Sequence, residues 1–262
     1  MPRKKIHRIV KKEQEVSQIL PPTLTLPWQG ALRILQDRIF KVRSPRGHGS
    51  GFHIGNFGDG GGLCAIATAY HVISSEHDWG EPIKITQAQT GKELLIKEND
   101  RAIFTYPDKD LAVILFKRPH DFELPTDQID LIPGSNLLPG VEVAWCGFPA
   151  IMADKPCFFH GYISCYLDNQ GDYLVDGVAI NGVSGGPVFY IENNTNKPKV
   201  AGVITAYVAN RATGETLPGL SVITSISPCE DTIKSLKTLN DAKKEVEEQK
   251  ITDSKSKSSD IV

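Results

Sequence analysis

The sequence predicts an all-β fold, an antiparallel barrel or sandwich, and three observations support this prediction. Between about residues 38 and 226 the chain consists of short β-rich runs, such as LCAIATAYHVI and VEVAWCGFP, separated by Gly, Pro, Asn and Asp. These runs do not alternate with long helical patterns, so βαβ units are not expected. The length of 262 residues suits one all-β unit with appendages.

The first 37 residues precede the β-rich part. Basic residues cluster in the opening MPRKKIHRIVKK, and such a cluster is most often a solvated tail, so no specific nucleic-acid partner is expected. From about residue 28, the run GALRILQ carries apolar residues at helical spacing. We therefore assign residues 1–37 to a basic N-terminal extension that ends in a short helix or turn leading into the first strand.

The end of the chain is predicted to be a helix and then a disordered tail. After Pro228 the segment CEDTIKSLKTLN carries Ile233, Leu236 and Leu239 on one side, preceded by acidic residues that suit a helix N-terminus. This pattern predicts a closing helix over about residues 228–240. Residues 241–262 lose the apolar stripe and are polar, so they are predicted to be disordered.

Composition argues against several classes of protein. No apolar run approaches the roughly 20 residues that a bilayer span needs, so no membrane partner is expected. The net charge of −2 gives no strong field to attract nucleic acid. The five cysteines form no C-x-x-C pair and have no histidine at zinc-ligand spacing, so we expect neither a metal nor a cofactor. Free thiols and the lack of a signal-peptide apolar region indicate a cytoplasmic protein.

Three segments supply the parts that acyl transfer requires. The first is ATAYHVI, in which His71 ends an apolar strand. A neutral imidazole there can take a proton near pH 7 and return it to a leaving amine. A single histidine beside a strand can also be structural, so this segment gains weight only together with the other two.

The second segment is DKDLAVILF, where Asp110 precedes six apolar residues typical of a strand buried on both faces. A carboxylate at the mouth of a buried strand is costly unless it is paired, and an imidazole N–H is a suitable partner. A strand-capping Asp is the alternative interpretation. Asp108 points to the same side of an extended chain and is the competing carboxylate.

The third segment, INGVSGGPVFY, is the most specific. Glycines before and after Ser184 allow a tight turn and a close approach to a substrate without a Cβ in the way. The backbone N–H groups of Gly182 and Ser184 can then converge on a developing oxyanion. A serine–glycine turn between two strands would explain the segment structurally.

Together the three residues follow the chain order His, Asp, Ser of the chymotrypsin triad. The segments GHGSGFHI, ATAYHVI, DLAVILF, GVSGGPVF and AGVITAYV resemble the trypsin-like serine peptidases in sequence and order, most closely bacterial members without disulfides. The resemblance covers about residues 38–240. It implies a chymotrypsin-like peptidase domain there, with two six-stranded antiparallel Greek-key barrels and a catalytic cleft between them.

The resemblance also implies a function for each matching position. The chain would be a serine endopeptidase that acts on a protein or peptide substrate, with His71 as general base, Asp110 orienting it and Ser184 as nucleophile. Gly182 and Ser184 would form the oxyanion hole. Substrate would be bound by a further set of residues, in which Val178 forms the pocket floor and Thr205 also stands where the family often has a hydroxyl near the triad carboxylate: Val178, Asn181, Thr205, Ala206, Tyr207 and Gly219.

Two departures from the family pattern bear on activation. Secreted members flank the histidine with cysteines, whereas here Val72 follows it and Cys64 lies well upstream. Many members have Asp or Asn directly before the serine, and this chain has Val183, which cannot pair with a buried amino terminus. We therefore expect no activating proteolytic cut, and expect the oxyanion loop to be ordered by packing or by an activating protein partner.

Two alternatives of the same fold remain open. One is a catalytically silent peptide-binding module, and the other is a protease scaffold that a partner activates. Too few residues follow the barrels for a PDZ-like domain, so an attached peptide-binding domain of that kind is not expected.

Overall fold

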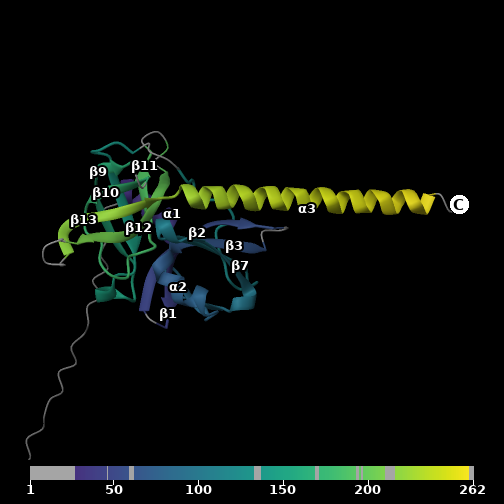
Figure 1. Cartoon of the computed structure of the whole chain (residues 1–262), viewed down its shortest axis with the longest axis horizontal. Coiled ribbons are helices and arrows are strands. Elements are labelled where there is room, and N and C mark those ends of the chain that lie inside the picture. Colours follow the sequence, from purple (N-terminus) through teal and green to yellow (C-terminus); the bar gives the residue numbers. More distant parts are fainter. Residues whose placement is uncertain are drawn as a thin grey trace, which may run out of the picture.

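The computed structural model describes residues 27–45, 47–58, 62–132, 137–168, 171–192, 195, 197–209 and 216–259. The predicted basic extension before residue 27 lies outside these residues. Two β-sheets make up the body, helix α1 lies where they meet, and helix α3 extends away from them as a long rod (Figure 1).

The N-terminal half is a single antiparallel sheet. Within the described residues it has seven strands in the order β5-β4-β1-β2-β3-β7-β6. The strands are β1 (Ile39–Ser44), β2 (Gly47–Phe57), β3 (Leu63–Ala69), β4 (Ile83–Gln87), β5 (Glu93–Ile96), β6 (Arg101–Tyr106) and β7 (Leu111–Lys117).

This sheet differs in detail from the closed six-stranded barrel that the resemblance implied. Its edge strands β5 and β6 do not pair with each other, so the sheet is not closed into a barrel. Apolar side chains fill the space that the curved sheet encloses. Phe122 stacks on Phe40 of β1, and Val72 and Ile73 pack into the same cluster from helix α2 (Tyr70–Asp78). Burying these apolar groups stabilises the sheet without closure of its hydrogen-bond ladder.

The C-terminal half is a closed antiparallel barrel. Its described strands follow the order β10-β13-β12-β11-β8-β9, with β9 pairing back onto β10. They are β8 (Glu142–Gly147), β9 (Cys157–Leu167), β10 (Asp172–Asp176), β11 (Pro187–Ile191), β12 (Pro198–Ala209) and β13 (Thr216–Ser225). The two sheets confirm the predicted chymotrypsin-like fold, and with the helices included the described chain is mostly β.

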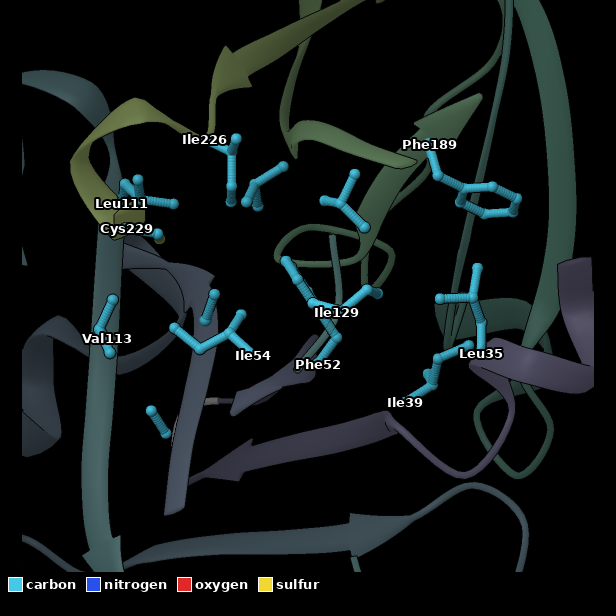
Figure 2. Close-up of a cluster of buried hydrophobic side chains, with 14 of the residues drawn as sticks. Leu35, Ile39, Phe52, Ile54, Leu111, Val113, Ile129, Phe189, Ile226 and Cys229 are labelled. Atoms are coloured by element: carbon cyan, nitrogen blue, oxygen red, sulfur yellow. The ribbon is translucent and has the colours of Figure 1, made fainter. Parts of the chain in front are cut away.

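Three buried apolar clusters hold this arrangement together. One lies inside each half, and the third lies between the halves, where Leu35, Phe52, Phe189 and Ile226 converge (Figure 2). Strand β7 explains why DLAVILF is so uniformly apolar. Its alternate residues face the cluster between the halves and the cluster inside the N-terminal sheet, so both faces are buried, as predicted.

The three α-helices of the described chain differ from prediction in two respects. Helix α1 (Pro27–Leu35) matches the predicted lead-in helix, and Trp28 inserts its ring against Phe158 and Phe189. Helix α2 differs from the sequence-based prediction of one extended segment, because its residues continue the apolar run of β3. Its buried Val72 and Ile73 face the sheet, so packing rather than helix propensity specifies it.

Helix α3 (Ser227–Ser259) extends well past the predicted end at residue 240. Its first turns pack Cys229 and Ile233 into the core between the halves, whereas Leu239 and Val246 are exposed. The second half is rich in Lys, Glu and Gln, which favour helix even without an apolar face. The predicted disordered tail is therefore helical as far as Ser259, and only its last three residues lie outside the described chain.

All five cysteines are unpaired, as the absence of a disulfide pattern predicted. Burial raises the pKa of Cys64 and Cys146 to about 12 and that of Cys229 further, so these three thiols stay protonated at neutral pH.

Among the helices of the described chain, none is long and apolar enough to cross a membrane.

Candidate active site

His71 and Asp110 meet at one end of the N-terminal sheet. Strands β3 and β7 pair antiparallel with Ala69 opposite Leu111, so the residues that follow β3 and precede β7 lie side by side. His71 is the second residue of α2, and Asp110 is the last residue before β7. The register of two neighbouring strands thus brings together side chains that are 39 positions apart in the sequence.

Three hydrogen bonds fix this pair. The Asp110 carboxylate accepts the His71 backbone N–H at 2.8 Å and the His71 Nδ1–H at 2.7 Å, and the Asp110 carbonyl accepts the Tyr70 N–H at 3.0 Å. A carboxylate can only accept, so Nδ1 carries the hydrogen and Nε2 of the neutral ring is free to take a proton. Asp110 is thus bound to both the backbone and the ring of the α2 N-terminus.

The competing carboxylate, Asp108, lies elsewhere. It is exposed in the 3₁₀ turn Pro107–Lys109, which reverses the chain before β7. Asp110 follows that turn with φ 48°, the only positive φ of a non-glycine residue in the described chain. Asp tolerates this left-handed conformation better than most residues, and here it directs the carboxylate towards His71.

Ser184 lies on the loop between β10 and β11 of the barrel. Gly182 and Gly185 on this loop have φ of 91° and 89°, a region that strongly favours glycine. A Cβ on Gly182 would collide with the Phe148 carbonyl, and one on Gly185 with the Ser50 carbonyl. These glycines therefore allow the loop to pack against the rest of the protein, whereas the sequence had suggested close approach to a substrate.

Two residues of this loop, Gly182 and Ser184, bring backbone N–H groups to the cleft. The Asn181 carbonyl accepts the Ala150 N–H at 2.7 Å, and because a trans peptide is planar, the Gly182 N–H of the same peptide points the opposite way. Within the described chain, the N–H groups of Gly182 and Ser184 donate to no protein acceptor. They are the two donors that the sequence suggested for an oxyanion hole.

His71 and Ser184 line one open cavity of about 250 Å³, together with Val72, Asn181, Gly182 and the β1–β2 residues Ser44, Gly47 and His48. The Ser184 Oγ donates to the Thr205 carbonyl at 3.4 Å, and across the described residues it makes no hydrogen bond to His71. His71 and Ser184 thus share the cleft without a hydrogen bond between them. Rotation about the Ser184 Cα–Cβ bond would redirect the hydroxyl.

The structure also locates the residues suggested for substrate binding. Val178 is 50% exposed on the same loop as Ser184, and Ala206 is exposed on β12. Gly219 has φ 82°, and its carbonyl accepts the Gly177 N–H at 2.7 Å, which closes the loop beside Val178. Tyr207 pairs with Ser221 through the backbone, and its side chain lies outside the described part.

Thr205 differs from the expectation. Its hydroxyl is buried and hydrogen-bonds to the Val222 carbonyl at 3.5 Å and the Thr224 hydroxyl at 3.1 Å, both on the neighbouring strand β13. Among the described residues this hydroxyl makes no hydrogen bond to Asp110, because it is directed at β13. The Thr205 carbonyl, and not its hydroxyl, faces the Ser184 side chain.

Two residues of β2 that the sequence did not single out reach this site. Ser50 is fully buried, and its hydroxyl hydrogen-bonds to both Phe148 and Gly182. His48 Nε2 lies 3.0 Å from the Phe148 carbonyl, and burial lowers the pKa of this imidazole. Both residues are in the run GHGSGF, but their partners are about a hundred positions away or more, so no local pattern reveals these contacts.

Comparisons with known proteins identify the family of this chain. The family model of the trypsin-like peptidase domain matches residues 49–195, just over half of the chain, and this range contains His71, Asp110 and Ser184. No curated protein sequence matches the chain.

Two solved structures are similar in fold. A serine endoprotease from Yersinia pestis aligns with a TM-score of 0.58 and 20% identity over 80% of this chain and 66% of that one. Deg5 aligns with a TM-score of 0.56 and 20% identity over 78% of this chain and 91% of that one. The chain thus spans slightly less than two thirds of the length of the Yersinia protein. From this family match, and with the fold of both solved structures in agreement, we conclude that the chain belongs to the family of trypsin-like peptidase domains.

Proposed function

We propose that this protein hydrolyses peptide bonds through an acyl-enzyme on Ser184, with His71 as general base and Asp110 as the residue that orients it. The observation that most strongly supports this proposal is the 2.7 Å hydrogen bond from His71 Nδ1–H to Asp110, at a cleft that His71 and Ser184 both line. This bond leaves Nε2 as the basic nitrogen of the ring.

The chemistry follows from these positions. Ser184 Oγ attacks the scissile carbonyl carbon while its proton passes to His71 Nε2, and the carbonyl oxygen becomes an oxyanion that accepts the N–H groups of Gly182 and Ser184. The C–N bond then breaks as His71 returns the proton to the leaving amine. Water repeats the sequence on the acyl-enzyme, losing a proton to His71 and releasing the acid and free Ser184.

One observation favours a second candidate, a scaffold of the same fold that becomes active only with a protein partner. The Ser184 hydroxyl points to the Thr205 carbonyl and not to His71. In the primary proposal substrate binding alone redirects this hydroxyl, because hydrogen bonds at catalytic residues often tighten only in the substrate complex. A catalytically silent peptide-binding module would leave the hydroxyl unreactive in every state.

A fluorophosphonate probe tests these possibilities on the full-length protein. We expect labelling of Ser184 with the N-terminus uncut, as read by intact-mass and peptide mass spectrometry. The variants Ser184→Ala and His71→Ala should lower peptide turnover by about 10⁴-fold or more, because triad residues act as a unit. The matched control is His77→Ala, which removes an exposed histidine from the same helix.

Each other outcome identifies a different reading. Labelling that requires an added protein would favour the partner-activated scaffold, and labelling that requires an N-terminal cut would contradict our account of activation. No labelling under any condition would favour the silent module. Peptide cleavage that survives in Ser184→Ala would refute the nucleophile assignment.

A further inference from the structure

We infer that Ser50 is a positioning residue for the oxyanion hole, and that its buried hydroxyl holds the Gly182 N–H in its outward direction. The inference rests on the proposed function, because it concerns the donors that would stabilise the oxyanion. Ser50 belongs to the N-terminal sheet, whereas the loop that it would hold belongs to the barrel.

The Ser50 side chain bridges two segments of the C-terminal half. Its Oγ donates to the Gly182 carbonyl at 2.8 Å and accepts the Phe148 N–H at 2.8 Å, and the residue is 0% exposed. Its backbone N–H also donates to the Ser184 carbonyl at 2.7 Å. Ser50 therefore contacts the residues on both sides of the proposed oxyanion site, as well as the segment behind them.

Residues 148–150 connect Ser50 to the Asn181–Gly182 peptide, which carries the Gly182 N–H. Phe148 is bound at both ends of its backbone, by Ser50 at the N–H and by His48 at the carbonyl. A carbonyl only accepts, so His48 Nε2 carries the hydrogen of that bond. Two residues further on, the Ala150 N–H binds the Asn181 carbonyl at 2.7 Å.

These bonds form a continuous chain from β2 to the oxyanion donor. Fixing the Gly182 carbonyl constrains the peptide after Gly182, and fixing the Asn181 carbonyl constrains the peptide before it, which carries the Gly182 N–H. Gly182 itself has a φ of 91° and would offer little resistance to rotation. The restraint on this peptide must therefore come from its hydrogen-bond partners. Ser50 is the side chain that joins the Gly182 carbonyl to the backbone of Phe148.

There is little room for a replacement partner. A Cβ on Gly147 would collide with the Ser50 hydroxyl, so β8 packs directly against it. Loss of the hydroxyl would leave the Phe148 N–H and the Gly182 carbonyl buried without this partner, which favours their rearrangement. The expected consequence is a misdirected Gly182 N–H in the transition state, with little change in the binding of a ground-state peptide.

The test compares Ser50→Ala with wild type in two kinds of measurement. In steady-state cleavage of one peptide, kcat should fall between about 10-fold and 100-fold with KM within about twofold, because only transition-state stabilisation is lost. In binding, a peptide boronic acid should lose a similar factor in affinity. Ser184 Oγ adds to its boron as the serine proton moves to His71, so the adduct places a boron-bound oxygen at the oxyanion donors. The same peptide with hydrogen in place of the boronic acid should bind with unchanged affinity.

The matched control is Ser221→Ala. Ser221 is also 0% exposed, and its hydroxyl also donates to one carbonyl, of Gly177, and accepts one backbone N–H, of Ala179, each at 2.8 Å. It holds the loop beside Val178 rather than the Gly182 peptide. Its loss should therefore change the affinities for the two ligands together and leave their ratio within about twofold of wild type.

An unchanged ligand ratio in Ser50→Ala, or an equal change in Ser221→Ala, would overturn the inference. If Ser50→Ala does not fold, His48→Ala removes the second bond to Phe148 at a partly exposed site, and its ligand ratio must fall in the same direction for the inference to stand. Failure of the proposed function is distinguishable, because wild type would then neither cleave the peptide nor bind the boronic acid more tightly than its hydrogen analogue.

Discussion

The two halves of this peptidase hold their parts of the site in different ways. The N-terminal sheet positions His71 and Asp110 internally, through the register of β3 and β7 and three hydrogen bonds within the same half. The barrel carries Ser184 on a loop whose hydrogen bonds include partners from the other half, namely the Ser50 hydroxyl and the Ser50 N–H. The proposed base and its orienting acid are thus held within one half, whereas the geometry of the proposed oxyanion loop depends on how the halves meet.

The largest expected effect tests the self-contained pair. Asp110→Asn should lower kcat by about 10⁴-fold, because an amide nitrogen facing His71 would stabilise the wrong tautomer of the imidazole. Asp108→Asn, two residues away on the exposed turn, should stay within about threefold of wild type, a surface change with no partner at the site. Steady-state kinetics on one peptide measure both. A larger loss in Asp108→Asn would move the orienting role to the other carboxylate.

A second prediction contrasts how a buried group in each half changes the stability of the protein as the pH falls. In the N-terminal sheet, burial lowers the pKa of His53 to about 4. The unfolded chain binds this proton near pH 6.5 and the folded chain does not, so stability is lost as pH falls through that window, by about 2 kcal/mol between pH 7 and pH 5. Urea unfolding of wild type and His53→Gln at both pH values should show that the variant lacks this loss.

The barrel contains a buried carboxyl group, Asp172, whose pKa shift has the opposite effect on stability as the pH falls. Burial raises the pKa of Asp172, while Lys109 and the Ser225 N–H partly offset the shift. The folded state therefore binds this proton more readily than the unfolded state, so the Asp172 contribution grows as pH falls towards 4. Asp172→Asn should remove this gain and make stability fall more steeply over the lowest pH values. Parallel curves for wild type and Asp172→Asn would contradict the assignment.

The smallest expected effect concerns specificity, which the barrel alone should determine. Val178 is half exposed beside the nucleophile loop and carries no charge, so a peptide library should show cleavage after small or medium apolar residues. Val178→Asp should raise kcat/KM for Arg or Lys relative to an apolar residue by about 10-fold, through pairing with the new carboxylate. Leu95→Asp, a similarly exposed change on edge strand β5, is the control. Dominant cleavage after Arg or Lys by wild type would refute the pocket assignment.

The sequence predicted those features of the site that short segments encode. Ser184 stands out because glycines lie within two positions on either side of it, and Asp110 because it directly precedes a strand that is buried on both faces. Their catalytic roles stay predictions until the variants are measured. Ser50 was missed because its hydroxyl partners lie 98 and 132 residues away, and a serine between glycines gives no local sign of them.

The errors in the fold have a related cause. Helix α2 continues an apolar run and is specified by the sheet it packs on, and helix α3 continues past its apolar stripe. The open edge of the N-terminal sheet depends on Phe122 and its neighbours filling the interior from a distant segment. Local patterns predict the strands, whereas the pairing of the edge strands depends on contacts between distant segments.

The apolar cluster between the halves also limits which hybrid proteins could be made by joining one half to the other half of a related protein. Leu35 and Phe52 on one side and Phe189 and Ile226 on the other form a single packed surface (Figure 2), so neither half presents a finished exterior. A hybrid that joined this N-terminal sheet to a barrel of another peptidase would have to match that surface residue by residue, or tolerate voids of the kind that cost several kcal/mol per large side chain. The halves are therefore exchangeable only as a co-adapted pair, even though each has a core of its own.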